Sequence, residues 1–127
     1  MKVLIDTSTY IWYINGSERL SKKAFEVIDN KQNQIFISIA SIWELSIKVK
    51  LGKLTLISDF NSIEEDLHNY NISVLPVTIK DILQNYKLPF VHRDPFDRII
   101  ISTAIVMDLP ILACDEFFDS YSVKRIW

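Results

Sequence analysis

The sequence predicts an α/β fold in which helices cover both faces of one mainly parallel sheet. Short runs that are apolar at every position alternate along the chain with longer windows of helical periodicity. Strands of that kind are buried on both faces, as in a parallel sheet between two layers of helices. The chain has 127 residues and 49% hydrophobic content, so we expect one domain over residues 1–127 with a core large enough to fold unaided.

The first half of the chain is predicted to contain two strands and three helices. In chain order these are strand Val3–Ile5, helix 7–15, helix 21–30, strand Ile35–Ile37 and helix 41–51. Both strands are short apolar runs. Gly16 and Gly52 follow the first and third helices, where glycine commonly ends a helix, and Ser21 is a suitable N-cap for the second.

The second half is predicted to contain three helices and three strands. In chain order these are helix 58–70, strand Ser73–Leu75, a helix after Thr78, a longer helix after Asp94, and strands Ile111–Ala113 and Val123–Ile126. Apolar residues at helical spacing predict the inward faces of the first two helices. These residues are Phe60, Ile63, Leu67 and Tyr70, followed by Ile79, Ile82, Leu83 and Tyr86. Thr78 and Asp94 are the predicted N-caps, and Pro95 takes the first helical position, which proline favours.

Charge, cysteine content and hydropathy exclude several classes of protein. Fourteen Lys and Arg residues stand against sixteen Asp and Glu, which excludes a polycation that holds nucleic acid by bulk charge. Cys114 is the only cysteine, which excludes an intrachain disulfide and a Cys-rich zinc site. No apolar stretch approaches the ~20 residues of a membrane span, and the run before Asp6 is too short for a signal peptide. We therefore expect a soluble, cytoplasmic protein.

Four acidic residues that are far apart in the sequence are predicted to meet at one edge of the sheet. They are Asp6, Glu44, Asp97 and Asp115. Asp6 and Asp115 follow predicted strands, whereas Glu44 and Asp97 lie in the first turns of predicted helices. Ligands of open α/β sheets bind beyond the carboxyl ends of the strands. The four acids are therefore candidate catalytic and metal-binding residues.

Each acid also has a purely structural interpretation. Asp6 can cap the helix that follows it, and Asp115 can be a solvated loop residue. Glu44 completes a capping-box pattern that begins at Ser41. Asp97 lies in the first turn of a helix, where the helix dipole favours an acid. Taken one at a time, the four acids are better explained by these structural roles.

Taken together, four converging carboxylates predict a cation site. Two carboxylates ~4 Å apart repel each other by about 4 kcal/mol at an effective dielectric constant near 20. Such a cluster either takes up protons or holds a cation. Oxygen ligands without a nearby cysteine favour Mg²⁺ or Mn²⁺. A divalent ion among carboxylates activates water and neutralises a phosphodiester, so metal-assisted phosphoryl chemistry is the predicted activity.

Several segments resemble the PIN-domain ribonucleases, and most closely the VapC-type toxins of bacterial toxin–antitoxin pairs. The segments are Leu4–Ser8, Ser41–Leu45, Lys50–Leu54 and His92–Arg98. The resemblance covers nearly the whole chain and implies a PIN-like three-layer α/β/α sandwich. It also implies an endoribonuclease that depends on Mg²⁺ or Mn²⁺, hydrolyses RNA, forms a homodimer and binds a VapB-type antitoxin.

The resemblance also implies that the four acids share one metal site. Asp6 and Asp97 match the acids that lie closest to the metal in the family, and Glu44 and Asp115 match the other two. Asp94 competes with Asp97 on spacing alone. The family match favours Asp97 as the ligand and Asp94 as the N-cap.

Other classes of protein compete with this interpretation. A receiver-type signalling domain has a similar length and an acid cluster, but it needs an acidic pair at the first strand and a phospho-accepting Asp after a central strand. A phosphatase of the haloacid-dehalogenase type needs a second acid two residues after Asp6, where Ser8 stands. A PIN-like interaction module without catalysis is a further alternative, which the presence of all four acids disfavours.

Some residues outside the acid set have open roles. His92, beside Arg93, is interpreted as structural or solvent-facing rather than as a substrate contact. Arg98 can bind phosphate or pair with a neighbouring acid, and the spacing does not decide between them. The run Tyr10–Ile14 is apolar around most of a helix, so part of it is expected to be covered by another chain.

Overall fold

Five parallel strands form the central sheet in the order β3-β2-β1-β4-β5. The computed structural model describes residues 1–127, and its strands are β1 (Lys2–Ile5), β2 (Gln34–Ser38), β3 (Ile72–Leu75), β4 (Ile111–Leu112) and β5 (Arg125–Ile126). All five coincide with or overlap predicted apolar runs. The central strand β1 pairs with β2 through Val3↔Ile35 and with β4 through Leu4↔Ile111. A strand with neighbours on both sides and helices on both faces is buried along its length, which explains the continuous apolar run.

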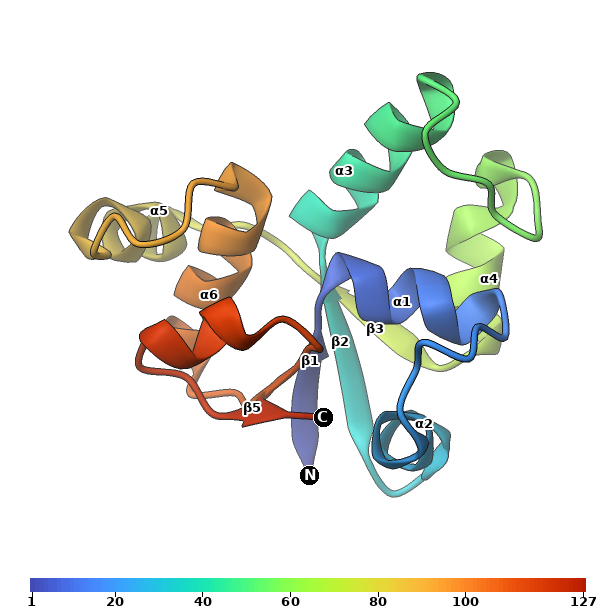
Figure 1. Ribbon diagram of the computed structural model, residues 1–127, viewed down its shortest axis with the longest axis horizontal. Helices are drawn as coiled ribbons and strands as arrows, with labels where there is room; N and C mark the ends of the chain where they lie inside the picture. The colour runs from blue at the N-terminus through green and yellow to red at the C-terminus, as the bar shows by residue number, and fades with distance from the viewer.

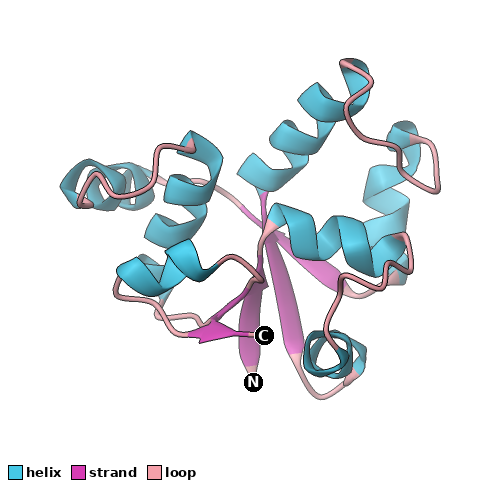
Figure 2. Ribbon diagram, viewed as in Figure 1, coloured by secondary structure: helices cyan, strands magenta, loops and turns pink.

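Helices cover both faces of the sheet and create three layers (Figures 1 and 2). They are α1 (Thr7–Ile14), α2 (Lys22–Asp29), α3 (Ile39–Lys50), α4 (Ile63–Asn69), α5 (Ile79–Lys87) and α6 (Pro95–Met107), with short 3₁₀ helices η1 (Phe60–Ser62) and η2 (Glu116–Ser120). Helices α1, α2 and α4 lie on one side of the sheet and α5 and α6 on the other, while α3 rises from the end of β2 (Figure 1). The predicted α/β/α sandwich with a parallel sheet is confirmed. None of the helices combines the length and apolar character needed to cross a membrane.

Successive side chains of β1 enter two different cores. Val3 and Ile5 pack in one core with residues of α1, α2 and α4, including Tyr10. Leu4, which lies between them, packs in the other core with Ile100 and other residues of α6. Complete burial of a Leu or Ile side chain contributes about 1.5–3 kcal/mol, so both helical layers are held firmly to the strand that precedes Asp6.

Helix α3 begins earlier than the sequence predicts. Ser38, the last residue of β2, is the N-cap, and its hydroxyl accepts a hydrogen bond from the backbone N–H of Ala40 at 3.1 Å. The predicted capping box from Ser41 to Glu44 is therefore wrong. Ser41 is buried inside the helix, where its hydroxyl accepts a hydrogen bond from the hydroxyl of Thr7 at 2.9 Å. This contact ties the start of α1 to α3.

The predicted inward face of α5 is also wrong. Its apolar residues point to solvent, with Ile79 80% and Tyr86 88% exposed. The buried residue is Asp81, whose carboxylate accepts hydrogen bonds from the backbone N–H of Thr78 at 3.0 Å and the hydroxyl of Thr103 at 2.9 Å. The bond to Thr103 attaches α5 to α6 through its polar side, which leaves the apolar side uncovered.

The apolar run Tyr10–Ile14 needs no second chain to cover it. Tyr10 and Ile14 are buried in the core. Trp12 packs against Trp127 with ring centroids 5.8 Å apart, and Tyr13 packs against aromatic rings of α2 and of the segment after α4. The prediction that this run is a partner surface therefore does not hold, because residues distant in the sequence cover it.

Candidate active site

The strand order creates a topological switch point between β1 and β4. The chain runs from β1 outward through β2 to β3, and then returns to place β4 on the opposite side of β1. In open α/β sheets, ligands bind at such a point, outside the carboxyl ends of the strands. Asp6 directly follows β1, and Asp115 lies shortly after β4. Both therefore stand where this topology places a ligand site.

A cleft of about 400 Å³ at this point brings all four predicted acids together. Its charged and titratable lining residues are Asp6, Glu44, Lys48, His92, Asp94, Asp97, Cys114 and Asp115. Helix α3 contributes Glu44 and α6 contributes Asp97, so segments from the whole length of the chain meet here (Figure 1). Three larger hollows, of about 790, 630 and 540 Å³, are lined by one, no and two acidic residues, compared with five in this cleft. The chemistry of the lining, and not its size, identifies the cleft.

Asp6 is both an N-cap and a buried carboxylate of the cleft. Its Oδ1 accepts a hydrogen bond from the backbone N–H of Thr9 at 2.9 Å and contacts the Thr9 hydroxyl, so the structural role considered from the sequence is real. Its exposed fraction is only 5%. Burial is the largest of the effects that raise the pKa of Asp6 to about 7; the Thr9 hydrogen bonds lower this pKa, and the nearby charges of Asp97 and Glu44 raise it.

Glu44 offers the cleft an oxygen that no protein group satisfies. Its Oε2 accepts a hydrogen bond from the ammonium group of Lys48 at 2.8 Å. Lys48 lies one helical turn further along α3. Its Oε1 is buried and has no hydrogen-bond donor. A buried carboxylate oxygen without a hydrogen-bond partner costs more free energy than a buried neutral polar atom without one. Such oxygens therefore normally lie beside a hydrogen-bond donor or a cation. Glu44 therefore has an open ligand position within the acid cluster.

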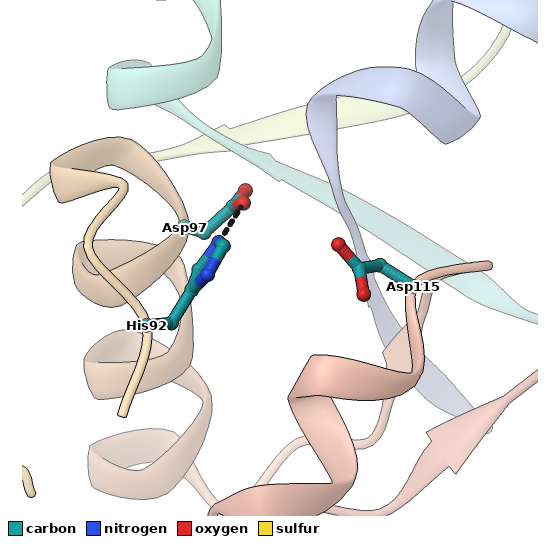
Figure 3. A group of neighbouring side chains, drawn as sticks. All are labelled: His92, Asp97 and Asp115. Carbon is teal, nitrogen blue, oxygen red and sulfur yellow. Dashed lines mark hydrogen bonds and ion pairs between the residues drawn. The ribbon is translucent and has the colours of Figure 1, made fainter. Parts of the chain in front are cut away.

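Asp97 lies at the start of α6 and is held by a histidine. His92 Nε2 lies 2.8 Å from Asp97 Oδ2 (Figure 3). Burial raises the pKa of Asp97 to about 6 against the opposing hydrogen bond from His92, and the charges of Asp94 and Glu44 add to the increase. Asp94 acts as the N-cap, because its Oδ1 accepts the backbone N–H groups of Phe96 at 2.9 Å and Asp97 at 3.0 Å.

Asp115 lies on the opposite rim of the cleft and is exposed to solvent. It caps η2, because its Oδ1 accepts the backbone N–H of Phe117 at 2.9 Å. The second carboxylate oxygen remains free of protein donors. One ligand atom from each of His92, Asp97 and Asp115 lies within 4.8 Å of the other two, and Figure 3 shows the carboxylates facing one another across the gap. The exposed Asp115 thus completes a cluster whose other acids are largely shielded from water.

The donor set fits a hard divalent cation. Carboxylate oxygens are the preferred ligands of Mg²⁺ and are common ligands of Mn²⁺. The orphaned Glu44 Oε1 and the raised pKa values of Asp6 and Asp97 are the features expected where carboxylates converge without a cation between them. Asp6, Asp97 and Glu44, with Asp115 on the rim, are the residues that could hold the ion.

Arg98 takes neither of the two roles considered from the sequence. Its guanidinium is buried and makes no ion pair, and its closest hydrogen bond is to the carbonyl of Pro89 at 2.8 Å. Longer hydrogen bonds of 3.4 Å reach the carbonyls of Asn85, Leu88 and His92. The buried Arg98 guanidinium therefore holds the segment between α5 and α6 from the inside.

His92 is the member of the cleft that sequence reasoning missed. A lone histidine in a polar loop carries no periodic signal, so the sequence alone favours a structural or solvent-facing role. Its spacing of five residues from Asp97 crosses the start of α6, where no helix rule predicts a contact. The only available signal was its place in the His92–Arg98 segment that supported the family resemblance.

The PIN domain profile matches residues 3–124, almost the entire length of the chain. The chain therefore belongs to the PIN-domain family, and this membership supports a nuclease. A search of curated proteins found no match. Receiver-type domains have the strand order 2-1-3-4-5, whereas the order here places β1 at the centre.

Solved structures share this fold at low sequence identity. DNA-bound VapBC from Salmonella typhimurium has a TM-score of 0.75 at 16% identity, with 99% of this chain and 97% of that chain covered. A toxin–antitoxin complex from Klebsiella pneumoniae has a TM-score of 0.69 at 15% identity, with coverage of 98% and 96%. VapC20 of Mycobacterium tuberculosis, a sarcin–ricin loop cleaving toxin, has a TM-score of 0.69 at 13% identity, with 95% of each chain covered.

The raised pKa of Asp6 predicts how stability depends on pH when metal is absent. Its carboxyl ionises near 3.8 when unperturbed and near 7 in the folded protein. Between these values the folded state binds more protons than the unfolded state, so this group lowers the free energy of unfolding as pH rises. Asp6→Asn removes the penalty and keeps an oxygen that can accept the Thr9 hydrogen bonds. Its stability advantage should grow from near zero at pH 4 to on the order of 2–4 kcal/mol at pH 8.

Urea unfolding of both proteins in EDTA, from pH 4 to pH 8, measures this difference. Asp29→Asn is the matched control, because Asp29 is exposed and lies outside the cleft. The difference in free energy of unfolding between Asp29→Asn and wild type should stay small from pH 4 to pH 8. An Asp6→Asn advantage that shrinks as pH rises would contradict a raised pKa.

Proposed function

We propose that the chain is a metal-dependent endoribonuclease and the toxin of a toxin–antitoxin pair, built as one PIN domain over residues 1–127. The observation that carries the proposal is the orphaned Oε1 of Glu44, buried in a cleft with two more shielded carboxylates, Asp6 and Asp97. A cation resolves the repulsion among them. Membership of the PIN-domain family supports the nuclease activity, and the resemblance of VapC20 to this chain supports RNA as its substrate.

The four acids have different tasks in this proposal. Asp6 and Asp97 are the principal ligands, because they match the acids that lie closest to the metal in the PIN-domain family. Glu44 and Asp115 complete the negative charge and orient the attacking water. A bound Mg²⁺ or Mn²⁺ would neutralise the phosphodiester and lower the pKa of water. Lys48 holds Oε2 of Glu44 at 2.8 Å, so the other oxygen is left to face the cleft.

Electrostatics explains why such a cleft needs the cation before RNA can enter. Asp6, Glu44, Asp94, Asp97 and Asp115 line it, and Lys48 is its only lysine or arginine. A phosphodiester that approached this set alone would be repelled. Neutralisation of the carboxylates therefore controls substrate entry as well as hydrolysis.

Loss of either principal ligand should abolish cleavage without unfolding the protein. Asp6→Asn and Asp97→Asn should each lower the rate of RNA cleavage in Mn²⁺ by at least ~100-fold, as expected when a group that acts in the transition state is removed. The assay is cleavage of a panel of structured RNAs, with near-ultraviolet circular dichroism as the test of folding. Asp29→Asn, which removes one exposed charge outside the cleft, is the control and should cleave like wild type. Full activity of both cleft variants would refute the proposed ligands.

The proposed partners are an antitoxin of the VapB type and a second copy of the chain, in the cytoplasm. An antitoxin that covers the cleft and inserts a cationic side chain would compete with the metal for the charges of Asp6 and Asp97. The toxin–antitoxin complex with the same fold supports this pairing. For the second copy, the exposed apolar surface lies on α3 and α5, along a hollow of about 630 Å³. Its exposed members are Ile39, Trp43, Ile47, Ile79, Ile82, Leu83 and Tyr86.

Charged substitutions on α5 should separate the proposed dimer. Ile79 and Tyr86 are 80% and 88% exposed, so Ile79→Glu and Tyr86→Glu remove little packing within one chain and should leave its fold intact. Large exposed apolar patches mark interfaces, and a buried charge there is costly. Light scattering at micromolar concentration should show a dimer for wild type and monomers for both variants. Ile57→Glu, at a residue 75% exposed whose backbone N–H donates to the side chain of Asn15 at the end of α1, should remain dimeric, and a monomeric wild type would refute the dimer.

A further inference from the structure

We propose that His92 is a positioning residue that holds the carboxylate of Asp97 in the orientation needed to bind the cation. The inference rests on the proposed function, because it assigns a role toward the same metal site. It departs from the interpretation of His92 as a structural or solvent-facing loop residue. His92 Nε2 engages Asp97 Oδ2 at 2.8 Å, whereas Asp97 Oδ1 has no protein donor. One oxygen is thereby fixed and the other is left for a ligand in the cleft.

The helix start does not explain the pair. Asp94 already accepts the backbone N–H groups of Phe96 and Asp97, which are the donors that need a cap at the beginning of α6. The start of α6 is therefore stable without the contact between His92 and Asp97, and the helix does not require His92 to leave solvent. Its side chain is only 18% exposed, which is low for a histidine on a loop at the rim of a cleft.

Two aromatic residues from the last part of the chain hold His92 in place. Its ring stacks on Phe117 with a centroid distance of 5.1 Å and an interplanar angle of 19°. Its backbone N–H donates to the phenolic oxygen of Tyr121 at 2.7 Å. Phe117 lies on η2, which Asp115 caps, so the support of His92 comes from the opposite rim of the same cleft (Figure 3).

The buried Arg98 fixes the same loop from the other side. Its guanidinium binds the carbonyl of Pro89 at 2.8 Å and the carbonyl of His92 itself at 3.4 Å. A buried cation normally pairs with a carboxylate, but every hydrogen bond of the Arg98 guanidinium goes to a backbone carbonyl. The ring, the backbone nitrogen and the backbone carbonyl of His92 are thus each held by a different residue.

His92 affects metal affinity because it orients the carboxylate of Asp97. Carboxylates that ligate metals are commonly fixed by outer hydrogen-bond partners, and loss of such a partner typically lowers metal affinity 10–100-fold. Without His92, the Asp97 carboxylate can rotate about its side-chain bonds, and this freedom must be lost when the ion binds. Glutamine places a side-chain N–H near the position of histidine Nε2, whereas asparagine is too short to reach it. The pair His92→Gln and His92→Asn therefore separates the donor from the imidazole ring.

The experiment measures Mn²⁺ affinity by calorimetry for wild type, His92→Gln and His92→Asn, with melting temperatures in EDTA as the test of folding. His92→Asn should bind Mn²⁺ about 10–100-fold more weakly, and His92→Gln should retain most of the wild-type affinity. Phe117→Ala, which keeps the histidine but removes its stacking partner, should fall between them and serves if His92→Asn fails to fold. Equal affinity of wild type and His92→Asn would overturn the inference, and so would an equal loss in both His92 variants.

Spectroscopy distinguishes positioning from direct ligation. Pulsed electron paramagnetic resonance of the Mn²⁺ complex should show no strong nitrogen coupling, because Nε2 binds Asp97 and not the ion. Strong coupling that disappears in His92→Gln would make His92 a ligand and overturn the positioning role. If wild type binds no Mn²⁺ at all, the proposed function itself fails, which is a different result from the failure of His92 alone.

Discussion

Repulsion among buried carboxylates at one end of the sheet is the constraint on which the rest of the structure depends. Burial and mutual charge raise the pKa of Asp6 to about 7 and that of Asp97 to about 6. A fold under selection for stability alone would replace such groups with neutral ones, since crowded charges oppose folding. Burial of apolar side chains in the two cores on either side of β1 stabilises the fold and offsets this repulsion. The fold thus holds the acids together at a cost that a bound cation would remove.

The two sides of the cleft are built by different means. Asp6 is fixed by regular structure, because it ends the central strand and caps α1 through Thr9. Asp97 lies on α6, but its carboxylate is oriented by His92, which belongs to a loop. That loop depends on Arg98 and Tyr121 for its shape. One carboxylate is therefore set by the topology of the sheet and the other by side chains that can be changed without altering the topology.

Features set by neighbours in the sequence could be predicted, and features set by distant contacts could not. The apolar runs predicted the strands, and the caps at Asp94 and Thr78 predicted the starts of α6 and α5. The inward face of α5 could not be predicted, because the Asp81–Thr103 bond that sets it joins residues 22 positions apart. The covering of Trp12 by Trp127 and the contact of His92 with Asp97 are likewise tertiary. The convergence of the four acids in one cleft could be predicted, because their positions follow from strand ends and helix starts.

If the four acids form a cation site, their cluster destabilises the metal-free protein and stabilises the metal-bound one. The most direct test compares the melting temperatures of wild type and Asp6→Asn at pH 8, first in EDTA and then in excess Mn²⁺. Binding to the folded state alone raises stability by RT ln(1 + [L]/Kd). We expect the order to reverse, with Asp6→Asn melting higher in EDTA and wild type melting higher in Mn²⁺. The same order in both conditions would contradict it.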